Sequence, residues 1–282
     1  MSRGVVLRVY GDRALVRSGD TLAEYRPKGT LRKEGLLAGD AVSLEGEHIV
    51  AVQPRGNQLG RPPVANASIL LAIASVRDPA VSQGDLDRVL LQAEAQRLEP
   101  LIVLNKCDLA SPEEIEQYLR PYAAAHYPVI RVSTQTGEGI DALRQALPQG
   151  IAVLSGQSGV GKSSILRRLT GVDVEIGRMT EKLRRGRHTT RAATLYEAGE
   201  GRMIADTPGF SDLELPEIEA NRLPSLYPEM EDLGCRFTDC RHRAEPDCAV
   251  IRAVEDGTLD AGRYRRYLEF LAELEGRPKR WH

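Results

Sequence analysis

Short apolar runs alternate with turn residues over the first sixty positions of the chain. Gly, Asp and Pro separate the runs, and this pattern predicts β-strands at Val5–Val9, Ala14–Arg17, Leu22–Tyr25, Ala41–Leu44 and His48–Val52. Strands this short and this closely spaced are typical of a small barrel, and the oligonucleotide-binding (OB) type has this size. A plain structural barrel would give the same pattern. We expect an OB-type barrel over residues 1–62, ending at the stiff tripeptide Arg61-Pro62-Pro63.

Beyond this tripeptide, apolar runs alternate with helical patterns. The expected strand–helix pairs are Ile69–Val76 with Leu86–Gln96, Leu101–Leu104 with Pro112–Ala125, Val129–Val132 with Ile140–Leu147, and Ile151–Leu154 with Lys162–Leu169. Such repetition predicts a mostly parallel sheet covered on both faces by helices, so residues 63–215 form a central α/β domain. From about Pro216 helices replace strands, and Leu259–Leu274 is the most helical segment. Residues 216–282 therefore predict a small α-rich module.

Composition and charge place the chain among ordinary globular proteins. Its 282 residues are 41% hydrophobic and carry a formal net charge of −2, so any affinity for nucleic acid must come from local patches. Ten basic against seven acidic residues between Arg3 and Arg61 give the barrel a mild positive excess that favours RNA contact. The longest apolar run, Ser68–Val76, is far short of the ~20 residues of a membrane span, and Met1–Arg13 lacks a signal-peptide core. We expect a soluble, cytoplasmic protein. The sequence has no heptad pattern that would indicate a coiled-coil oligomer, so we also expect a monomer.

A phosphate-binding loop is the strongest single motif. Residues 156–163 read GQSGVGKS and fit G-x-x-x-x-G-K-[ST], with an apolar strand before them and a helix-competent segment after them. Inward-pointing backbone N–H groups and the helix N-terminus stabilise a polyphosphate at such a loop. Lys162 should reach the β and γ phosphates, and the Ser163 hydroxyl should bind Mg²⁺. The candidate nucleotide-binding residues here are Gly156, Gln157, Ser158, Gly159, Val160, Gly161, Lys162, Ser163 and Ser164.

A second segment can hold the metal ion from across the phosphates. Residues 203–209 read MIADTPG, which is an apolar strand that ends at Asp206. Asp206 can hold Mg²⁺, and the Gly209 N–H can sense the γ-phosphate. Asp-Thr-Pro-Gly alone would be an ordinary turn, but its occurrence together with a phosphate loop favours the magnesium role.

The base is predicted by a third segment. Residues 101–108 read LIVLNKCD, a buried-type strand that ends in Asn105, Lys106, Cys107 and Asp108. The Asp108 carboxylate can accept hydrogen bonds from guanine N1–H and the exocyclic amine, whereas adenine has no donor at N1. Asn105 can read the other edge of the base or tie the loops together, the Lys106 stem can lie over the ring, and the strand end at Ser133 can present a backbone N–H to guanine O6. We therefore predict GTP and GDP as ligands and disfavour an ATP-dependent kinase or ATPase.

Three of the four cysteines lie close together near the C-terminus, with a histidine among them. Cys235, Cys240, His242 and Cys248 offer three thiolates and one imidazole, a complete tetrahedral shell for one structural Zn²⁺. Free buried cysteines in a reducing compartment are the alternative. Cys107 is remote from this group.

The order of the nucleotide motifs identifies a family. In ordinary small GTPases the phosphate loop comes first, but here Asn105–Asp108 precedes Gly156–Ser163 and Asp206–Gly209 comes last, which is a circular permutation. This order, with a small barrel before it and a Cys/His cluster after it, resembles the bacterial family called ribosome small subunit-dependent GTPase A over essentially the whole chain. The resemblance implies GTP hydrolysis stimulated by the small ribosomal subunit, contact with its rRNA, and a role in late subunit assembly. An rRNA-binding placeholder that uses nucleotide only to set its shape is the alternative.

The resemblance also implies roles in the first switch. Residues 186–190 read GRHTT and correspond to that switch, so Thr189 or Thr190 would complete the Mg²⁺ shell. Phe210 stands where Ras-type enzymes carry a water-orienting glutamine, which implies slow unaided turnover. Within the family His188 is a candidate replacement, and a surface histidine or an RNA contact is the alternative. Five positive charges and no acid between Lys182 and Arg191 favour rRNA phosphates over a merely solvated face.

Overall fold

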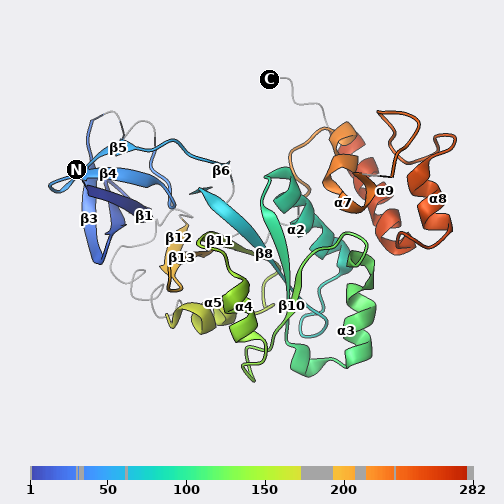
Figure 1. The fold of residues 1–282 in the computed structure, drawn as a ribbon, viewed down its shortest axis with the longest axis horizontal. Coiled ribbons are helices and arrows are strands. Elements are labelled where there is room, and N and C mark those ends of the chain that lie inside the picture. The colour runs from blue at the N-terminus through green and yellow to red at the C-terminus, as the bar shows by residue number, and fades with distance from the viewer. Residues whose placement is uncertain are drawn as a thin grey trace.

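The structure is a computed structural model that describes residues 2–29, 31, 35–60, 63–172, 193–206, 214–231 and 233–277. Its elements form three groups that follow one another along the chain (Figure 1). The first group consists of β1 (Ser2–Tyr10), β2 (Arg13–Ser18), β3 (Thr21–Pro27), β4 (Ala41–Glu45) and β5 (His48–Val52), followed by the two-stranded pair β6 (Gln58–Leu59) and β7 (Val64–Ala65).

Strands β1 to β5 close into the predicted barrel. Strand β1 pairs with both β2 and β4, and β3 pairs with β5, which gives the closed order β1-β2-β3-β5-β4. Alternate residues along these strands point inward, as the period of two requires. The barrel core consists of Val6, Ala14, Val16, Val42, Leu44 and Ile49.

The second group is an α/β layer structure. It consists of β8 (Ala67–Ser75), α2 (Gln83–Ala95), β9 (Glu99–Asn105), α3 (Pro112–Leu119), β10 (Val129–Arg131), α4 (Ile140–Ala146), β11 (Gly150–Ser155), α5 (Lys162–Thr170), β12 (Thr194–Glu197) and β13 (Arg202–Asp206). Strands β10, β9, β8, β11 and β13 are neighbours in that order and parallel, and each predicted strand–helix pair is present. Helices α2 and α3 lie on one side of the sheet and α4 and α5 on the other (Figure 1).

Two helices differ from their predicted lengths for local reasons. The helix expected over Pro112–Ala125 ends at Leu119, and a 3-10 turn at Arg120–Tyr122 follows it. Pro121 cannot donate the backbone hydrogen bond that would continue the helix. Helix α2 begins three residues before its predicted start because the Ser82 hydroxyl caps it, accepting from the backbone N–H of Asp85.

The barrel and the α/β strands share one eleven-stranded sheet. The apolar pattern does not predict β12, which runs antiparallel to β13 and pairs on its other side with β1 at Arg8 and Thr194. The two parts also approach closely at Gly39, where φ is +94° and a Cβ atom would lie 2.9 Å from Cδ1 of Ile151 in β11. The barrel is therefore an extension of the central sheet.

The third group is the predicted α-rich module. It contains α7 (Pro228–Glu231), α8 (Ala249–Glu255) and α9 (Ala261–Glu275), with 3-10 turns at Ala220–Arg222 and Pro224–Leu226. Its core includes Leu223, Tyr227, Val250 and Tyr267, and it continues onto Leu91 of α2. The module therefore packs against the side of the sheet that α2 covers (Figure 1). None of the helices within the described ranges has the length and apolar character that crossing a bilayer requires.

Candidate nucleotide site and metal centre

The loops that carry the predicted nucleotide motifs start from one edge of the sheet. Parallel pairing places Ser75 of β8 beside Asn105 of β9, Ala72 of β8 beside Ser155 of β11, and Val153 of β11 beside Ala205 of β13. The carboxyl ends of these parallel strands therefore meet, as they do at the ligand sites of open α/β sheets. Segments that are shuffled along the chain are brought together at this edge.

The phosphate loop joins β11 to α5 in a conformation that requires glycine. Gly156 has a φ of +143°, and a Cβ atom there would lie 2.2 Å from the Ile73 carbonyl oxygen. Gly161 has a φ of +98°, and a Cβ atom there would lie 2.2 Å from the Asn105 amide nitrogen. Side chains at either position would collide with atoms that hold the loop in place.

The other residues of this loop differ in their contacts and in their exposure to solvent. The Lys162 ammonium donates hydrogen bonds to the carbonyl oxygens of Gly156 and Gln157, both at 2.6 Å, so it lies across the loop. Ser158 and Gly159 are exposed, whereas Val160 is fully buried. Ser163 and Ser164 lie partly buried in the first turn of α5, whose N-terminus carries partial positive charge.

Asn105 joins the phosphate loop to the loop that follows β10. Its side chain is 1% exposed, and its Nδ2 donates to the Val160 carbonyl oxygen at 2.8 Å. Its Oδ1 accepts from the backbone N–H of Thr134 at 3.2 Å. Of the two roles that the sequence leaves open for Asn105, these hydrogen bonds correspond to tying the loops together.

The residues after Asn105 turn sharply toward solvent. Lys106 has a φ of +60°, and its ammonium donates to the Asp78 carbonyl oxygen. The Cys107 thiol donates to the Leu104 carbonyl oxygen at 3.1 Å, and burial raises the pKa of this thiol. Asp108 is exposed in the 3-10 turn Cys107–Leu109. The Asp108 carboxylate is therefore accessible to a ligand from solvent.

Ser133 lies buried at the start of the loop after β10. Its backbone N–H donates to the Glu138 carbonyl oxygen at 3.0 Å, and its hydroxyl accepts from the backbone N–H of Thr136 at 3.1 Å. The Arg168 guanidinium of α5 donates to the Thr134 carbonyl oxygen at 2.7 Å. The backbone N–H and the hydroxyl oxygen of Ser133 are therefore engaged in shaping this loop.

The structure describes only some of the residues that the sequence predicts near Mg²⁺ and the γ-phosphate. Asp206 is the last residue of β13 and is half-buried. His188, Thr189, Thr190 and Gly209 lie outside the described residues, as do Phe210 and the basic run between Lys182 and Arg191.

One contact of the phosphate loop has no counterpart among the sequence predictions. The Gln157 amide Nε2 donates to Asp85 Oδ2 of α2 at 2.7 Å. The Ser-x-x-Asp spacing at Ser82 marks the start of that helix, but nothing in the sequence indicates that the helix start meets the phosphate loop.

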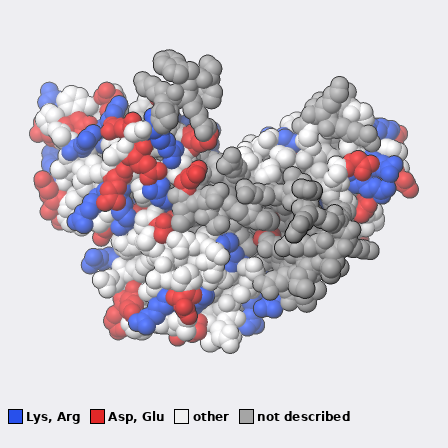
Figure 2. All heavy atoms as spheres, turned by 180° about the vertical axis from the view of Figure 1, so that it is seen from behind, with Lys and Arg blue, Asp and Glu red and all other residues white. Residues whose placement is uncertain are grey.

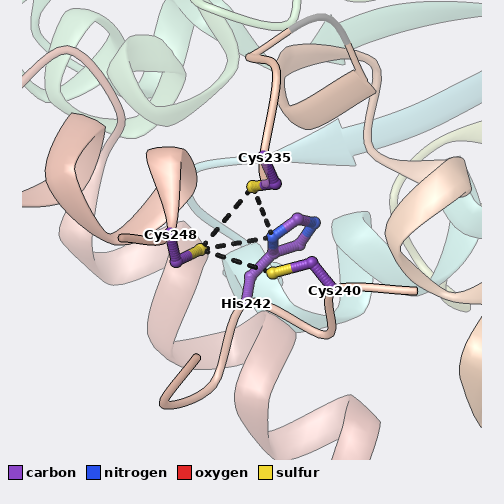
Figure 3. A group of neighbouring side chains, drawn as sticks. All are labelled: Cys235, Cys240, His242 and Cys248. Atoms are coloured by element: carbon purple, nitrogen blue, oxygen red, sulfur yellow. Dashed lines mark hydrogen bonds between the residues drawn. The ribbon is translucent and has the colours of Figure 1, made fainter. Parts of the chain in front are cut away.

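The predicted cysteine and histidine ligands converge in the C-terminal module (Figure 3). Cys235 Sγ lies 3.8 Å from Cys248 Sγ, and Cys240 Sγ lies 3.7 Å from Cys248 Sγ. His242 Nδ1 lies 3.5 Å from Cys235 Sγ and 3.4 Å from Cys248 Sγ. A tetrahedral Zn²⁺ with bonds of about 2.3 Å to sulfur and about 2.0 Å to nitrogen would separate its ligands by about 3.5–3.8 Å. The donor set and its spacing fit zinc in a closed shell.

The surrounding polypeptide fixes the orientation of these ligands. His242 adopts a left-handed backbone with a φ of +55°, and its carbonyl oxygen accepts from the Tyr264 hydroxyl at 2.6 Å. Burial lowers the pKa of His242, which favours the neutral imidazole that a metal requires. Burial raises the pKa of the Glu245 carboxylate, but hydrogen bonds from backbone N–H groups, including those of Arg241 and Arg243, outweigh this effect and leave it at about 2.

Several of the described basic residues of the barrel are paired with acids. Arg13 contacts Glu24 at 3.1 Å, Lys28 contacts Glu45 at 2.9 Å, and Arg55 is paired with the buried Asp40. Figure 2 shows Lys and Arg interspersed with Asp and Glu over the described residues of the face seen there. These ion pairs engage cationic groups that could otherwise contact phosphates, while the net charge of the barrel stays as its composition sets it.

Comparisons with known proteins agree with this arrangement. The model of the family described as RsgA GTPase matches residues 52–216. The chain is 37% identical to "Small ribosomal subunit biogenesis GTPase RsgA" of Halalkalibacterium halodurans over 293 residues, covering 99% of each protein, and 40% identical to the protein of the same name from Geobacillus thermodenitrificans over the full length of both.

Solved structures show the same likeness over the whole chain. The crystal structure of YjeQ from Thermotoga maritima superposes with a TM-score of 0.85 at 31% identity, covering 98% of this chain and 99% of that one. YloQ, described as a circularly permuted GTPase, gives a TM-score of 0.82 at 30% identity, covering 100% and 97%. The permuted GTPase fold predicted from motif order is confirmed. The chain therefore belongs to the RsgA GTPase family and is a hydrolase that acts on GTP.

Proposed function

We propose that GTP and GDP bind at the sheet edge where the phosphate loop, the Asn105–Asp108 segment and Asp206 meet. The loop backbone, the N-terminus of α5 and the Lys162 ammonium hold the phosphates. Ser163 and Asp206 hold Mg²⁺, which when bound neutralises charge on the β and γ phosphates. The Asn105 side chain carries the proposal, because its two hydrogen bonds fix the phosphate loop and the base-side loop relative to each other.

Guanine is selected by Asp108. Its exposed carboxylate follows the strand that Asn105 ends, so it can accept from the N1–H and amine of a base whose phosphates lie in the adjacent loop. Adenine would leave the carboxylate unpaired, and an unpaired polar group in a contact of this kind discriminates strongly. Ser133 supports this edge by shaping its loop, with its backbone N–H and hydroxyl oxygen already engaged.

Hydrolysis is slow in the isolated chain and stimulated by the small ribosomal subunit. Phe210 cannot orient the attacking water as a glutamine would, so the enzyme depends on another group. His188 is our candidate, and Thr189 or Thr190 completes the Mg²⁺ shell. Binding of the basic run 182–191 to rRNA phosphates would bring this segment to the subunit. The protein thereby acts in late maturation of the small subunit.

The three parts have separate tasks, with boundaries at 62/63 and 215/216. The barrel contacts rRNA, residues 63–215 bind and hydrolyse GTP, and residues 216–282 form a module held together by one structural Zn²⁺ on Cys235, Cys240, His242 and Cys248. Zinc when bound supplies rigidity to a module with a small core of its own. The protein acts as a monomer in the cytoplasm.

The deciding experiment compares GTP hydrolysis by the full chain alone, with purified small subunits, and with purified large subunits. Stimulation by small subunits alone is expected. Equal rates in all three samples would favour the alternative, an rRNA-binding placeholder that uses nucleotide only as a conformational switch. Asp108→Asn should relax the preference for guanine, and unchanged discrimination in that variant would contradict the proposed base site.

A further inference from the structure

The first turn of α2 is held from two opposite sides. Asp85 faces the phosphate loop and Asp87 faces α9 of the C-terminal module. Residues two apart in an α-helix point about 200° apart around its axis, so neighbouring acids can serve separate partners. This part of α2 therefore contacts both the phosphate loop and the C-terminal module.

On the phosphate-loop side, Gln157 is bound to a preorganised acceptor. Asp85 Oδ2 accepts from Gln157 Nε2 at 2.7 Å and from the Ser82 hydroxyl at 2.6 Å. The Ser82 oxygen in turn accepts from the backbone N–H of Asp85 at 3.0 Å. The carboxylate is therefore fixed by the helix cap, and any shift of the cap displaces the partner of Gln157.

On the other side, two arginines of α9 hold Asp87. The Asp87 side chain is fully buried, and its Oδ1 accepts from Arg263 at 2.5 Å. Its Oδ2 accepts from Arg266, which also donates to Gln83 Oε1 at 3.1 Å. Arg263 is 3% exposed and also pairs with Glu229 of α7. Separating these charges would leave at least one of them buried without a partner, so the first turn of α2 and α9 behave as one body.

Helix α9 is joined in turn to the metal cluster. The Tyr264 hydroxyl donates to the carbonyl oxygen of the ligand His242, and the Tyr267 hydroxyl donates to that of Arg241, both at 2.6 Å. Tyr267 is fully buried and packs edge-on against Tyr227 at 5.1 Å between ring centroids. Three sets of hydrogen bonds, joined through α2 and α9 themselves, thus link the phosphate loop to the loop that carries His242.

We infer that Gln157 is a positioning residue that couples nucleotide in the phosphate loop to the packing of the C-terminal module, through the first turn of α2. The inference rests on the proposed function, since it requires the loop to hold a nucleotide. Coupling between two sites is reciprocal: if GDP favours the docked position of α9, loosening α9 must weaken GDP binding. Arg266, which lies at the α2–α9 contact, should therefore influence nucleotide affinity through Gln157.

A double-mutant cycle on the full-length, zinc-loaded protein tests this coupling. The GDP dissociation constant is measured with a fluorescent GDP analogue for the original chain, Gln157→Ala, Arg266→Ala and the double variant. Each single substitution should raise the constant about fivefold, as expected for one lost hydrogen bond, and the double variant should show about the same fivefold rise. Arg265→Ala is the matched control, because Arg265 is the exposed neighbour on the same helix, and it should leave the constant within about twofold.

The outcomes separate the inference from the proposed function. No measurable GDP binding by the original chain would contradict the proposed function itself. Normal binding with an unchanged constant in Arg266→Ala, or a rise of about 25-fold in the double variant, would overturn the coupling alone. Amide hydrogen exchange at Tyr264 and Tyr267 is a second measurement, and it requires no substitution at the α2–α9 contact. GDP should slow exchange there in the original chain and not in Gln157→Ala, and equal slowing in both would also overturn the inference.

Discussion

Asn105→Ala tests the central feature of the proposed site. The substitution removes the hydrogen bonds to the Val160 carbonyl oxygen and from the Thr134 N–H, each contributing about 1 kcal/mol. It also leaves buried polar groups without partners, which adds about 1–2 kcal/mol. The free energy of unfolding should therefore fall by about 3–4 kcal/mol. GDP affinity should fall at least tenfold at saturating Mg²⁺ because the two loops lose their fixed relation.

The measurements are urea unfolding followed by circular dichroism and titration with a fluorescent GDP analogue at a temperature where the variant stays folded. Asn57→Ala provides a matched control. The Asn57 side chain donates to the Ala67 carbonyl oxygen at 2.7 Å and accepts from the Ala67 N–H at 3.0 Å, at the start of β8 and away from the loops. It should lose comparable stability and keep its GDP affinity. A folded Asn105→Ala protein that binds GDP as tightly as the original chain would refute the reasoning.

Three further predictions concern the loop, the metal and pH. Gly161→Ala should abolish detectable GDP binding, whereas Gly171→Ala at the other end of α5 should cost about 1 kcal/mol of stability and leave binding intact. The reason is that both glycines have a positive φ, but of the two only Gly161 has another residue within reach of an added Cβ atom. Equal losses of GDP binding in the two variants would contradict this steric argument. Mass spectrometry under native conditions should find one zinc per chain, lost in His242→Ala and retained in Cys107→Ser, and a metal-free original protein would remove the zinc assignment. Glu245→Gln should lower the free energy of unfolding by about 1–2 kcal/mol at pH 7. The pKa of Glu245 is about 2 in the folded protein and its ordinary value is 4.5, so the difference in free energy of unfolding between the original chain and this variant should shrink as pH falls from about 4.5 toward 2. If denaturant unfolding shows a constant difference over that range, the backbone hydrogen bonds are not the cause of the stability loss.

The motif-bearing loops were predictable because their chemistry is local. A phosphate loop needs glycines at fixed spacing next to a strand and a helix, so residues 156–163 could be assigned from the sequence alone. Cysteines and a histidine in one short segment likewise indicate a shared ligand set wherever the surrounding chain runs. In both cases the sequence spacing itself carries the geometry.

Contacts between distant segments were not predictable in the same way. Strand β12 is four residues long and is stabilised by pairing with β13 and β1, so its own apolar pattern is too short to identify it. Arg263 reads as one more charge on an amphipathic helix, and only tertiary packing shows it buried among three tyrosine rings and two acids. The role of Asn105 depends on hydrogen-bond partners 29 and 55 residues away.

The pairing of β12 with β1 has a consequence for any attempt to shorten the protein. Cutting away the first sixty residues would strip β12 of a neighbour and leave amide and carbonyl groups of its outer margin without partners. An exposed edge strand can pair with strands of other molecules, so the shortened protein should tend to self-associate and precipitate. The N-terminal barrel is thus also a cover for the outer edge of β12.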